Sequence, residues 1–275
     1  MLLSLRDVVG IALTPEHVTG VRVSRGWRRR VVDQRHAACD GAENEPPWKR
    51  AVSALQMLLP ALAREPAKAS VVLSNRFVRY VVVPAHDQLT GLQEEEAFAR
   101  HCFREVYGDA AQTWEVRVSP AAVGQPAIAS AIDRELLSAV RELFTGTALR
   151  LWSIQPHLMA AYNRSRRKLR GRACLFLLAE ERFYTCMALV RGSCRAVHSG
   201  VFDGALSQHL PVILDREYLW SGMEKRPTVL VCAPEHASVR LTAATAWGGN
   251  GLQFDDTAGI ASALAPVYRT ALTVT

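Results

Sequence analysis

The chain has 275 residues, of which 49% are hydrophobic and 21% are charged, and its formal net charge is +7. These values are typical of a globular protein with one large domain or two lobes. The sequence also excludes a membrane-spanning helix, because no segment reaches the roughly 18 to 20 unbroken apolar residues that span a bilayer. Residues 1–7 carry no basic leader, so the sequence predicts a cytosolic protein without a secretory signal.

Hydrophobic periodicity predicts alternating strands and helices along the first part of the chain. The predicted strands cover residues 7–13, 18–24, 28–34, 69–73, 77–84, 114–118, 127–132 and 149–152. The predicted helices cover residues 48–64, 88–107, 133–144 and 155–163. His101 is placed on the apolar side of the second helix and is interpreted as a core residue, not a metal ligand. The other residues predicted on that side are Leu92, Ala97, Phe98, Cys102 and Val106.

The second part of the chain follows a basic link at residues 164–172 and has a similar pattern. Its predicted strands cover residues 174–179, 183–190, 193–199, 228–232 and 252–254. Its predicted helices cover residues 204–219 and 235–247, and another begins near Asp256. The glycine-rich segment 248–251 follows a predicted helix, so it is interpreted as a helix stop and not as a phosphate loop.

Each half therefore opens with three consecutive strands, followed by a helix and a further strand. This repeated order is typical of the α/β, actin-like (ribonuclease H-type) fold, in which two lobes each contain a mixed sheet flanked by helices. The predicted lobes are residues 1–168 and 169–275. A small inserted α/β subdomain is predicted at about residues 88–132 of the first lobe.

The common catalytic and metal-binding motifs are absent from the sequence. The six cysteines form no Cys-x-x-Cys pair and most lie in apolar runs, so they are predicted to be free thiols. The chain contains no P-loop, no Gly-x-Ser-x-Gly elbow and no His-x-x-x-His spacing. The sequence predicts neither catalytic residues nor a metal site.

Basic residues are clustered in three places: residues 25–30, residues 164–172, and the pair Arg191 and Arg195. Such clusters attract polyanions or lie on anionic lipid headgroups. A solvated basic surface explains the same pattern, and both interpretations stay open at this stage. The residues predicted to face a membrane are Arg166, Arg167, Lys168 and Arg170.

Three short segments, in their order along the chain, resemble a known family: Gly10-Ile11 with Val18 to Val23, Leu149 to Ala161, and Ala188 to Gly192. The chain resembles the PilM family of actin-like proteins and the related cytoplasmic domain of the GspL family, over nearly its whole length. These families serve type IV pilus and type II secretion inner-membrane assemblies. The resemblance implies a cytoplasmic scaffold, peripheral to the inner membrane, that recruits a short segment of a PilN-like or GspM-like membrane protein. The assembly ATPase is a further implied partner.

The resemblance also indicates which residues occupy the nucleotide-contacting loops. Active relatives have an aspartate and a glycine after the first strand, where the aspartate organises magnesium. This chain has Ala12 and Thr14 at those positions, and it has Leu178 and Glu180 in the corresponding loop of the second half. Ala233 follows the strand at 228–232, where a Gly-Gly pair is expected. The sequence therefore predicts a pseudo-ATPase that uses neither ATP nor magnesium as a cofactor.

Two alternatives remain from the sequence. The first is an active actin-like ATPase or kinase that uses other carboxylates, such as Asp203 or Glu181. The second is a basic nucleic-acid-binding protein, which the net charge favours. Apart from Trp27, the basic segments lack the interleaved aromatic residues that stack on bases, which speaks against this second alternative.

Overall fold

The computed structural model describes residues 7–24, 29–41, 44–86, 91–122, 124–169, 171–236, 247, 252–254 and 264–275. The chain divides into two compact units, and each is built from segments that are distant in sequence. The first unit contains Met1–Phe77, Arg134–Ala160 and Thr257–Thr275. The second unit contains Val78–Asp133 and Ala161–Asp256.

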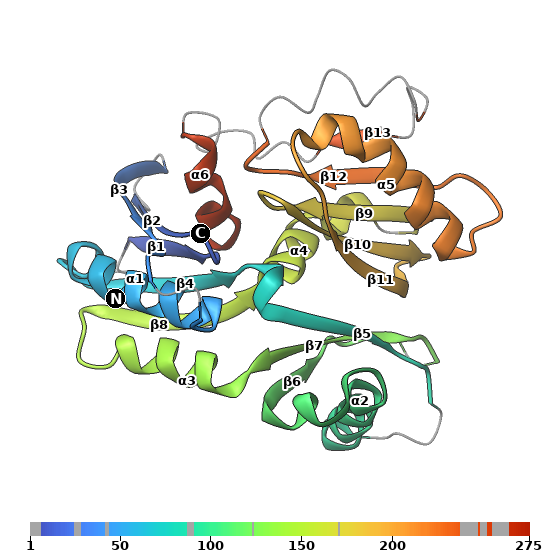
Figure 1. Cartoon of the computed structure of the whole chain (residues 1–275), viewed down its shortest axis with the longest axis horizontal. Helices are drawn as coiled ribbons and strands as arrows, with labels where there is room; N and C mark the ends of the chain where they lie inside the picture. The colour runs from blue at the N-terminus through green and yellow to red at the C-terminus, as the bar shows by residue number, and fades with distance from the viewer. Residues whose placement is uncertain are drawn as a thin grey trace, which may run out of the picture. The chain divides into compact units, whose positions relative to one another are not determined.

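A five-stranded mixed sheet forms the centre of the first unit, with the strand order β3-β2-β1-β4-β8 (Figure 1). Its strands are β1 (Val8–Leu13), β2 (His17–Ser24), β3 (Arg30–Ala38), β4 (Ala67–Leu73) and β8 (Leu149–Pro156). The helices α1 (Pro47–Leu62) and α3 (Arg134–Leu143) lie side by side on one face of the sheet. The C-terminal elements α6 (Pro266–Arg269) and η5 (Thr270–Val274) pack near β1 on the other face, and the short helix η1 (Asn75–Phe77) follows β4. Because both faces are covered, every residue of β1 is buried.

A second five-stranded sheet has the order β11-β10-β9-β12-β13. Its strands are β9 (Cys174–Ala179), β10 (Phe183–Val190), β11 (Ser193–Val201), β12 (Thr228–Cys232) and β13 (Leu252–Phe254). One face is covered by α5 (Leu206–Ser221), whose apolar residues join the core of Leu175, Leu177 and Tyr184. On α4 (His157–Leu169), Tyr162 contacts Phe176, which alternates to the opposite face.

The second unit also contains a small antiparallel sheet with the order β5-β7-β6. Its strands are β5 (Val78–Val83), β6 (Trp114–Val118) and β7 (Ala127–Asp133). The helix α2 (Leu92–Tyr107) and the short helix η2 (Gly108–Thr113) pack against it. The strand pair predicted at 114–118 and 127–132 is confirmed.

The predicted repeat of three strands, a helix and a strand is confirmed in both five-stranded sheets. In each, the first three strands are antiparallel and the fourth is parallel to the first. The lobes predicted at residues 1–168 and 169–275 stay a prediction. The two compact units are defined by packing and not by chain order, because the C-terminal residues 264–275 pack against the strands at the start of the chain.

The prediction for the buried side of α2 was only partly right: Phe98 and Cys102 are half-buried and pack against the core, as predicted. The side chain of Leu92 lies outside the described residues. Ala99 and Phe103 are the fully buried residues of this helix, whereas Ala97, His101 and Val106 are exposed. Phe103 packs with the ring of Trp114, and this contact fixes the rotation of the helix. His101 is therefore not a core histidine. Apart from Ala97, the apolar residues of this helix lie on one half of its surface, so its periodicity did not show that Ala99 and Phe103 are the most deeply buried.

The predicted basic link is also largely helical, because α4 continues to Leu169. Ser165 and Leu169 are buried one helical turn apart, so the inward-facing side of α4 extends through the basic segment. Basic side chains in the last turn of a helix interact favourably with its dipole. The six cysteines are free thiols, as predicted. Most of the predicted helix at 235–247, the helix predicted near Asp256, the segment 248–251 and most of the cluster at 25–30 lie outside the described residues.

Candidate functional site

Ala12, the first predicted loop residue, lies inside the sheet of the first unit. It belongs to β1 and is aligned with Thr19 of β2 and Val72 of β4. Only 1% of its surface is exposed. A buried methyl group provides no ligand for a metal ion or a water molecule, whereas metals such as magnesium prefer oxygen ligands.

Thr14 closes the turn between β1 and β2 with its own polar groups. Its Oγ1 donates a hydrogen bond to the carbonyl oxygen of His17 at 2.9 Å and accepts one from the His17 N–H at 3.0 Å. The Thr14 N–H also donates to the His17 carbonyl oxygen, at 3.0 Å. The next residue, Pro15, has no N–H. These hydrogen bonds use donors that a phosphate-binding loop would present to an anion.

A carboxylate also lies in this turn. Glu16 forms an ion pair with Arg76, and both side chains are about 41% exposed. A bound phosphate would therefore compete with Glu16 for the guanidinium group of Arg76. An exposed ion pair of this kind contributes at most about 1 kcal/mol, so Glu16 matters here mainly for the charge that it places in the turn.

Gly10 has a packing role that the sequence did not reveal. A Cβ atom at this position would overlap the backbone carbonyl oxygen of Ala271 in η5 and would also contact the side chain of Thr275. Glycine is therefore required where the C-terminal segment approaches β1. This contact explains the glycine of the Gly10-Ile11 pair without a nucleotide.

The other three predicted loop residues meet at one edge of the second five-stranded sheet. Leu178 is fully buried near the end of β9, and Glu180 and Ala233 follow the ends of β9 and β12. These strands are parallel neighbours, so their carboxyl ends lie together. The structure thus brings Leu178, Glu180 and Ala233 together, while Ala12 and Thr14 belong to the first unit.

His236 links the two loops at this edge. Its Nε2 donates a hydrogen bond to the carbonyl oxygen of Glu180 at 2.9 Å, and its N–H donates to the carbonyl oxygen of Ala233 at 3.1 Å. Its ring also packs on Phe202, with 5.8 Å between the ring centroids. Sequence analysis missed His236, because no local pattern distinguishes it from other loop histidines.

Glu180 brings negative charge into this edge. Glu180 is only 5% exposed, and its backbone N–H donates a hydrogen bond to the carbonyl oxygen of Phe183 at 2.8 Å. Burial raises the pKa of Tyr80 well above its ordinary value, and the charge of Glu180 raises it further. Glu180 is therefore close enough to Tyr80 for its charge to act on the phenol, and an anion placed here would be repelled.

Other residues considered from the sequence lie on the surface. Arg166, Arg167 and Lys168 are exposed on α4, and the side chain of Arg170 lies outside the described residues. Glu181 and Asp203, the carboxylates of the alternative ATPase hypothesis, are exposed. Within the described residues, no group of three or more histidine, cysteine, aspartate or glutamate side chains is arranged to hold a metal ion.

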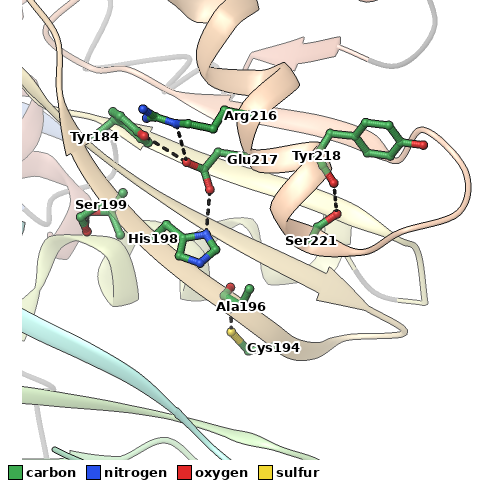
Figure 2. Close-up of polar contacts among 10 residues, drawn as sticks. Tyr184, Cys194, Ala196, His198, Ser199, Arg216, Glu217, Tyr218 and Ser221 are labelled. Atoms are coloured by element: carbon green, nitrogen blue, oxygen red, sulfur yellow. Dashed lines mark hydrogen bonds and ion pairs between the residues drawn. The ribbon is translucent and has the colours of Figure 1, made fainter. Parts of the chain in front are cut away.

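A buried carboxylate that the sequence did not single out connects α5 to β10 and β11 (Figure 2). Glu217 is 2% exposed. Its Oε1 accepts a hydrogen bond from the Tyr184 hydroxyl, and its Oε2 pairs with His198 Nδ1, both at 3.0 Å. Arg216 Nε lies 3.7 Å from Oε1. A buried carboxylate needs such partners, so Glu217 fixes the end of α5 against the sheet.

Solved structures resemble this chain over almost its full length. The PilM–PilN type IV pilus biogenesis complex matches with a TM-score of 0.64 and 14% identity, covering 97% of this chain and 96% of the other. A protein of Bacteroides thetaiotaomicron with an actin-like ATPase fold and unknown function matches with a TM-score of 0.60 and 10% identity, covering 99% and 97%. The chain has the actin-like fold.

The cytoplasmic domain of EpsL also matches this actin-like chain. EpsL is an inner-membrane component of the type II secretion system of Vibrio cholerae, and its match has a TM-score of 0.57 and 11% identity, covering 98% of this chain and 95% of the other. The structural resemblance to PilM and to a GspL-type cytoplasmic domain is thus confirmed. No family model matches the chain, and no curated protein matches it in sequence. In the part of the chain that the structure describes, no helix is both long and apolar enough to cross a membrane.

Proposed function

We propose that this chain is a non-catalytic actin-like scaffold of a type IV pilus or type II secretion inner-membrane platform. In this role it binds, from the cytoplasmic side, a short segment of a PilN-like or GspM-like membrane protein, and the assembly ATPase is a second candidate partner. The observation that carries the proposal is the nearly complete, two-way coverage of the match to PilM in its complex with PilN. The match to cytoplasmic EpsL supports the same setting.

The non-catalytic part of the proposal is supported by the loop residues. Ala12 is a buried methyl, Thr14 is hydrogen-bonded within its own turn, and Glu180 adds a carboxylate where a triphosphate would need cations. Ala233 is tied to His236 by its carbonyl oxygen. In the first of these loops, Ala12 supplies no metal-organising carboxylate, and the N–H groups of Thr14 and His17 are already hydrogen-bonded within the turn.

MgATP is expected to leave the unfolding temperature of this chain unchanged. A ligand at 100 times its Kd stabilises a protein by about 2.7 kcal/mol, which a thermal unfolding curve detects readily. The measurement is thermal unfolding with increasing MgATP, with an active actin-like ATPase as the positive control. A saturable rise in the unfolding temperature would contradict the pseudo-ATPase proposal and favour the ATPase or kinase alternative. Asp203→Asn and Glu181→Gln would then show which carboxylate is used.

An affinity capture from detergent-solubilised membranes of the host is expected to enrich a single-span inner-membrane protein together with pilus or secretion components. Mass spectrometry identifies the captured proteins, and a peptide of the cytoplasmic segment then gives the Kd by titration. Capture of nucleic-acid-associated proteins alone would contradict the scaffold proposal and favour the nucleic-acid alternative. In that case, binding to DNA or RNA should weaken steeply with salt.

A further inference from the structure

Basic residues from three separate segments converge on one edge of the second five-stranded sheet. Cys174, at the start of β9, is aligned with Leu189 near the end of β10 and with Thr228 at the start of β12. The segment that joins α4 to β9, the β10–β11 turn and the segment before β12 therefore lie at the same edge, which we call the basic edge. Its exposed basic residues are Arg164, Arg166, Arg167, Lys168, Arg172, Arg191, Arg195, Lys225 and Arg226.

Acidic residues are scarce at the basic edge and collect at the opposite one. Residues 143–179 and 183–202 contain no aspartate or glutamate. Two acidic residues lie near the basic edge: Glu224, which is exposed in the segment before β12, and Asp215, which lies 3.9 Å from Arg226 as an ion pair. The loops that follow β9, β11 and β12, at the opposite edge, carry Glu180, Glu181, Asp203 and Glu235. Within this five-stranded sheet, basic residues are thus more numerous at one end of the strands and acidic residues at the other.

The turn between β10 and β11 places a cation at the tip of the basic edge. Arg191 and Gly192 form a two-residue hairpin turn with positive φ values of 54° and 85°. Asparagine or glycine suits the first position of such a turn better than arginine. In the described part of the chain, Arg191 is the only residue other than glycine with a positive φ.

Two large apolar side chains accompany the cations. Leu219 and Trp220, in the last turn of α5, are 76% and 56% exposed. The helix ends at Ser221, and only residues 222–227 separate it from the start of β12 at the basic edge. This last turn therefore lies towards the basic edge. The hydrogen bond from the Tyr218 hydroxyl to the Glu224 carbonyl oxygen joins the helix end to the connecting segment.

Trp220 is held in place although it is exposed. The His198 ring lies 5.0 Å from the indole in an edge-to-face arrangement, and the Arg216 guanidinium lies 5.1 Å from it. Both neighbours are themselves anchored near the buried carboxylate of Glu217 (Figure 2). The indole is therefore held between these two neighbours while 56% of the residue stays exposed, so its binding to a surface costs little conformational entropy.

We propose that the basic edge binds a membrane surface of anionic phospholipids, with Leu219 and Trp220 entering the headgroup region. Cations beside exposed tryptophan and leucine are typical of proteins that bind at the membrane interface. A nucleic acid would need open aromatic faces for base stacking, and Arg216 and His198 already contact Trp220. This inference goes beyond the scaffold role, since it requires no protein partner.

Co-sedimentation with vesicles tests the proposal on the intact chain. The probes are vesicles of phosphatidylcholine alone and of phosphatidylcholine with phosphatidylglycerol, and binding is expected only to the second. Arg166→Glu with Arg167→Glu is expected to weaken binding by roughly 30-fold, since each arginine near an anionic surface accounts for about a fivefold change in affinity. The control is Arg182→Glu, which reverses the charge of one exposed side chain at the opposite edge. It should change binding by less than about twofold.

The apolar pair gives a second readout. Leu219→Ser with Trp220→Ser is expected to weaken binding to the anionic vesicles by roughly tenfold at unchanged net charge. Vesicles should shift the tryptophan emission of the unaltered protein to shorter wavelength, and Trp220→Phe should remove most of that shift. Circular dichroism verifies that each variant is folded.

Three results would overturn the proposal: equal binding to both kinds of vesicle, equal losses for the two charge-reversal variants, or full binding by the serine variant. Tight binding to DNA that is insensitive to Leu219 and Trp220 would overturn it in favour of a nucleic-acid surface. Because the vesicles contain no protein, failure here leaves the capture of a membrane partner unaffected. Failure of that capture likewise leaves the vesicle result unaffected.

Discussion

Glu217→Ala is expected to lower the free energy of unfolding of the second unit by about 3 kcal/mol. The change leaves the Tyr184 hydroxyl without its acceptor in the core and removes the carboxylate that faces His198 and Arg216. Breaking one partner of a buried charged network costs about 3 to 5 kcal/mol. The lower figure applies because His198 is 36% exposed and Arg216 is 42% exposed, so both regain water. Thermal unfolding followed by circular dichroism measures the loss, as a fall of roughly 6–12 °C.

Two further variants separate the contributions of this network. Tyr184→Phe removes one hydrogen bond and leaves Glu217 its other partners, so a loss of about 1 kcal/mol is expected. Asp215→Ala removes an exposed carboxylate two residues away and should cost less than about 0.5 kcal/mol. If Glu217→Ala and Asp215→Ala had equal effects, the buried network would not stabilise the unit.

Gly10→Val is expected to displace the C-terminal segment 264–275 from β1 and to cost about 3 kcal/mol. The new Cβ atom would overlap the carbonyl oxygen of Ala271, and a backbone atom moves only with its whole segment. Displacement exposes Ala271 and Leu272, which are almost fully buried. Burial of one leucine alone stabilises a protein by about 1.5–3 kcal/mol. Thermal unfolding measures the loss, and limited proteolysis reports the release of the C-terminal segment.

Gly91→Ala is the matched control, since a Cβ atom there would have no neighbour within 4 Å. It should leave the unfolding temperature and the proteolytic pattern nearly unchanged. If Gly10→Val altered nucleotide binding while the C-terminal segment stayed protected, Gly10 would serve a nucleotide and not this packing. That outcome would also weaken the pseudo-ATPase proposal.

The loop residues show how far the candidate site follows from the sequence. The family resemblance and residue identity predict that Ala12 and Thr14 replace an aspartate and a glycine, and this stays a prediction. The hydrogen bonds of Thr14 with His17 and the link from His236 to Glu180 were not predictable, because their geometry depends on the folded turns. His236 and Glu180 are 56 residues apart in the chain and meet only because β9 and β12 are neighbours.

The sequence by itself determined the order of strands and helices, and through it the actin-like fold. Periodicity is a local property, so it was reliable where a segment has one clearly apolar side or is buried on both sides, as in β1 and β9. Tertiary structure decided that Ala99 and Phe103 are the fully buried residues of α2, where Phe103 packs against Trp114. It also decided that Glu217 meets His198 and that three basic segments share one edge. Those contacts join residues distant in sequence, and strand register, which no local pattern encodes, brings them together.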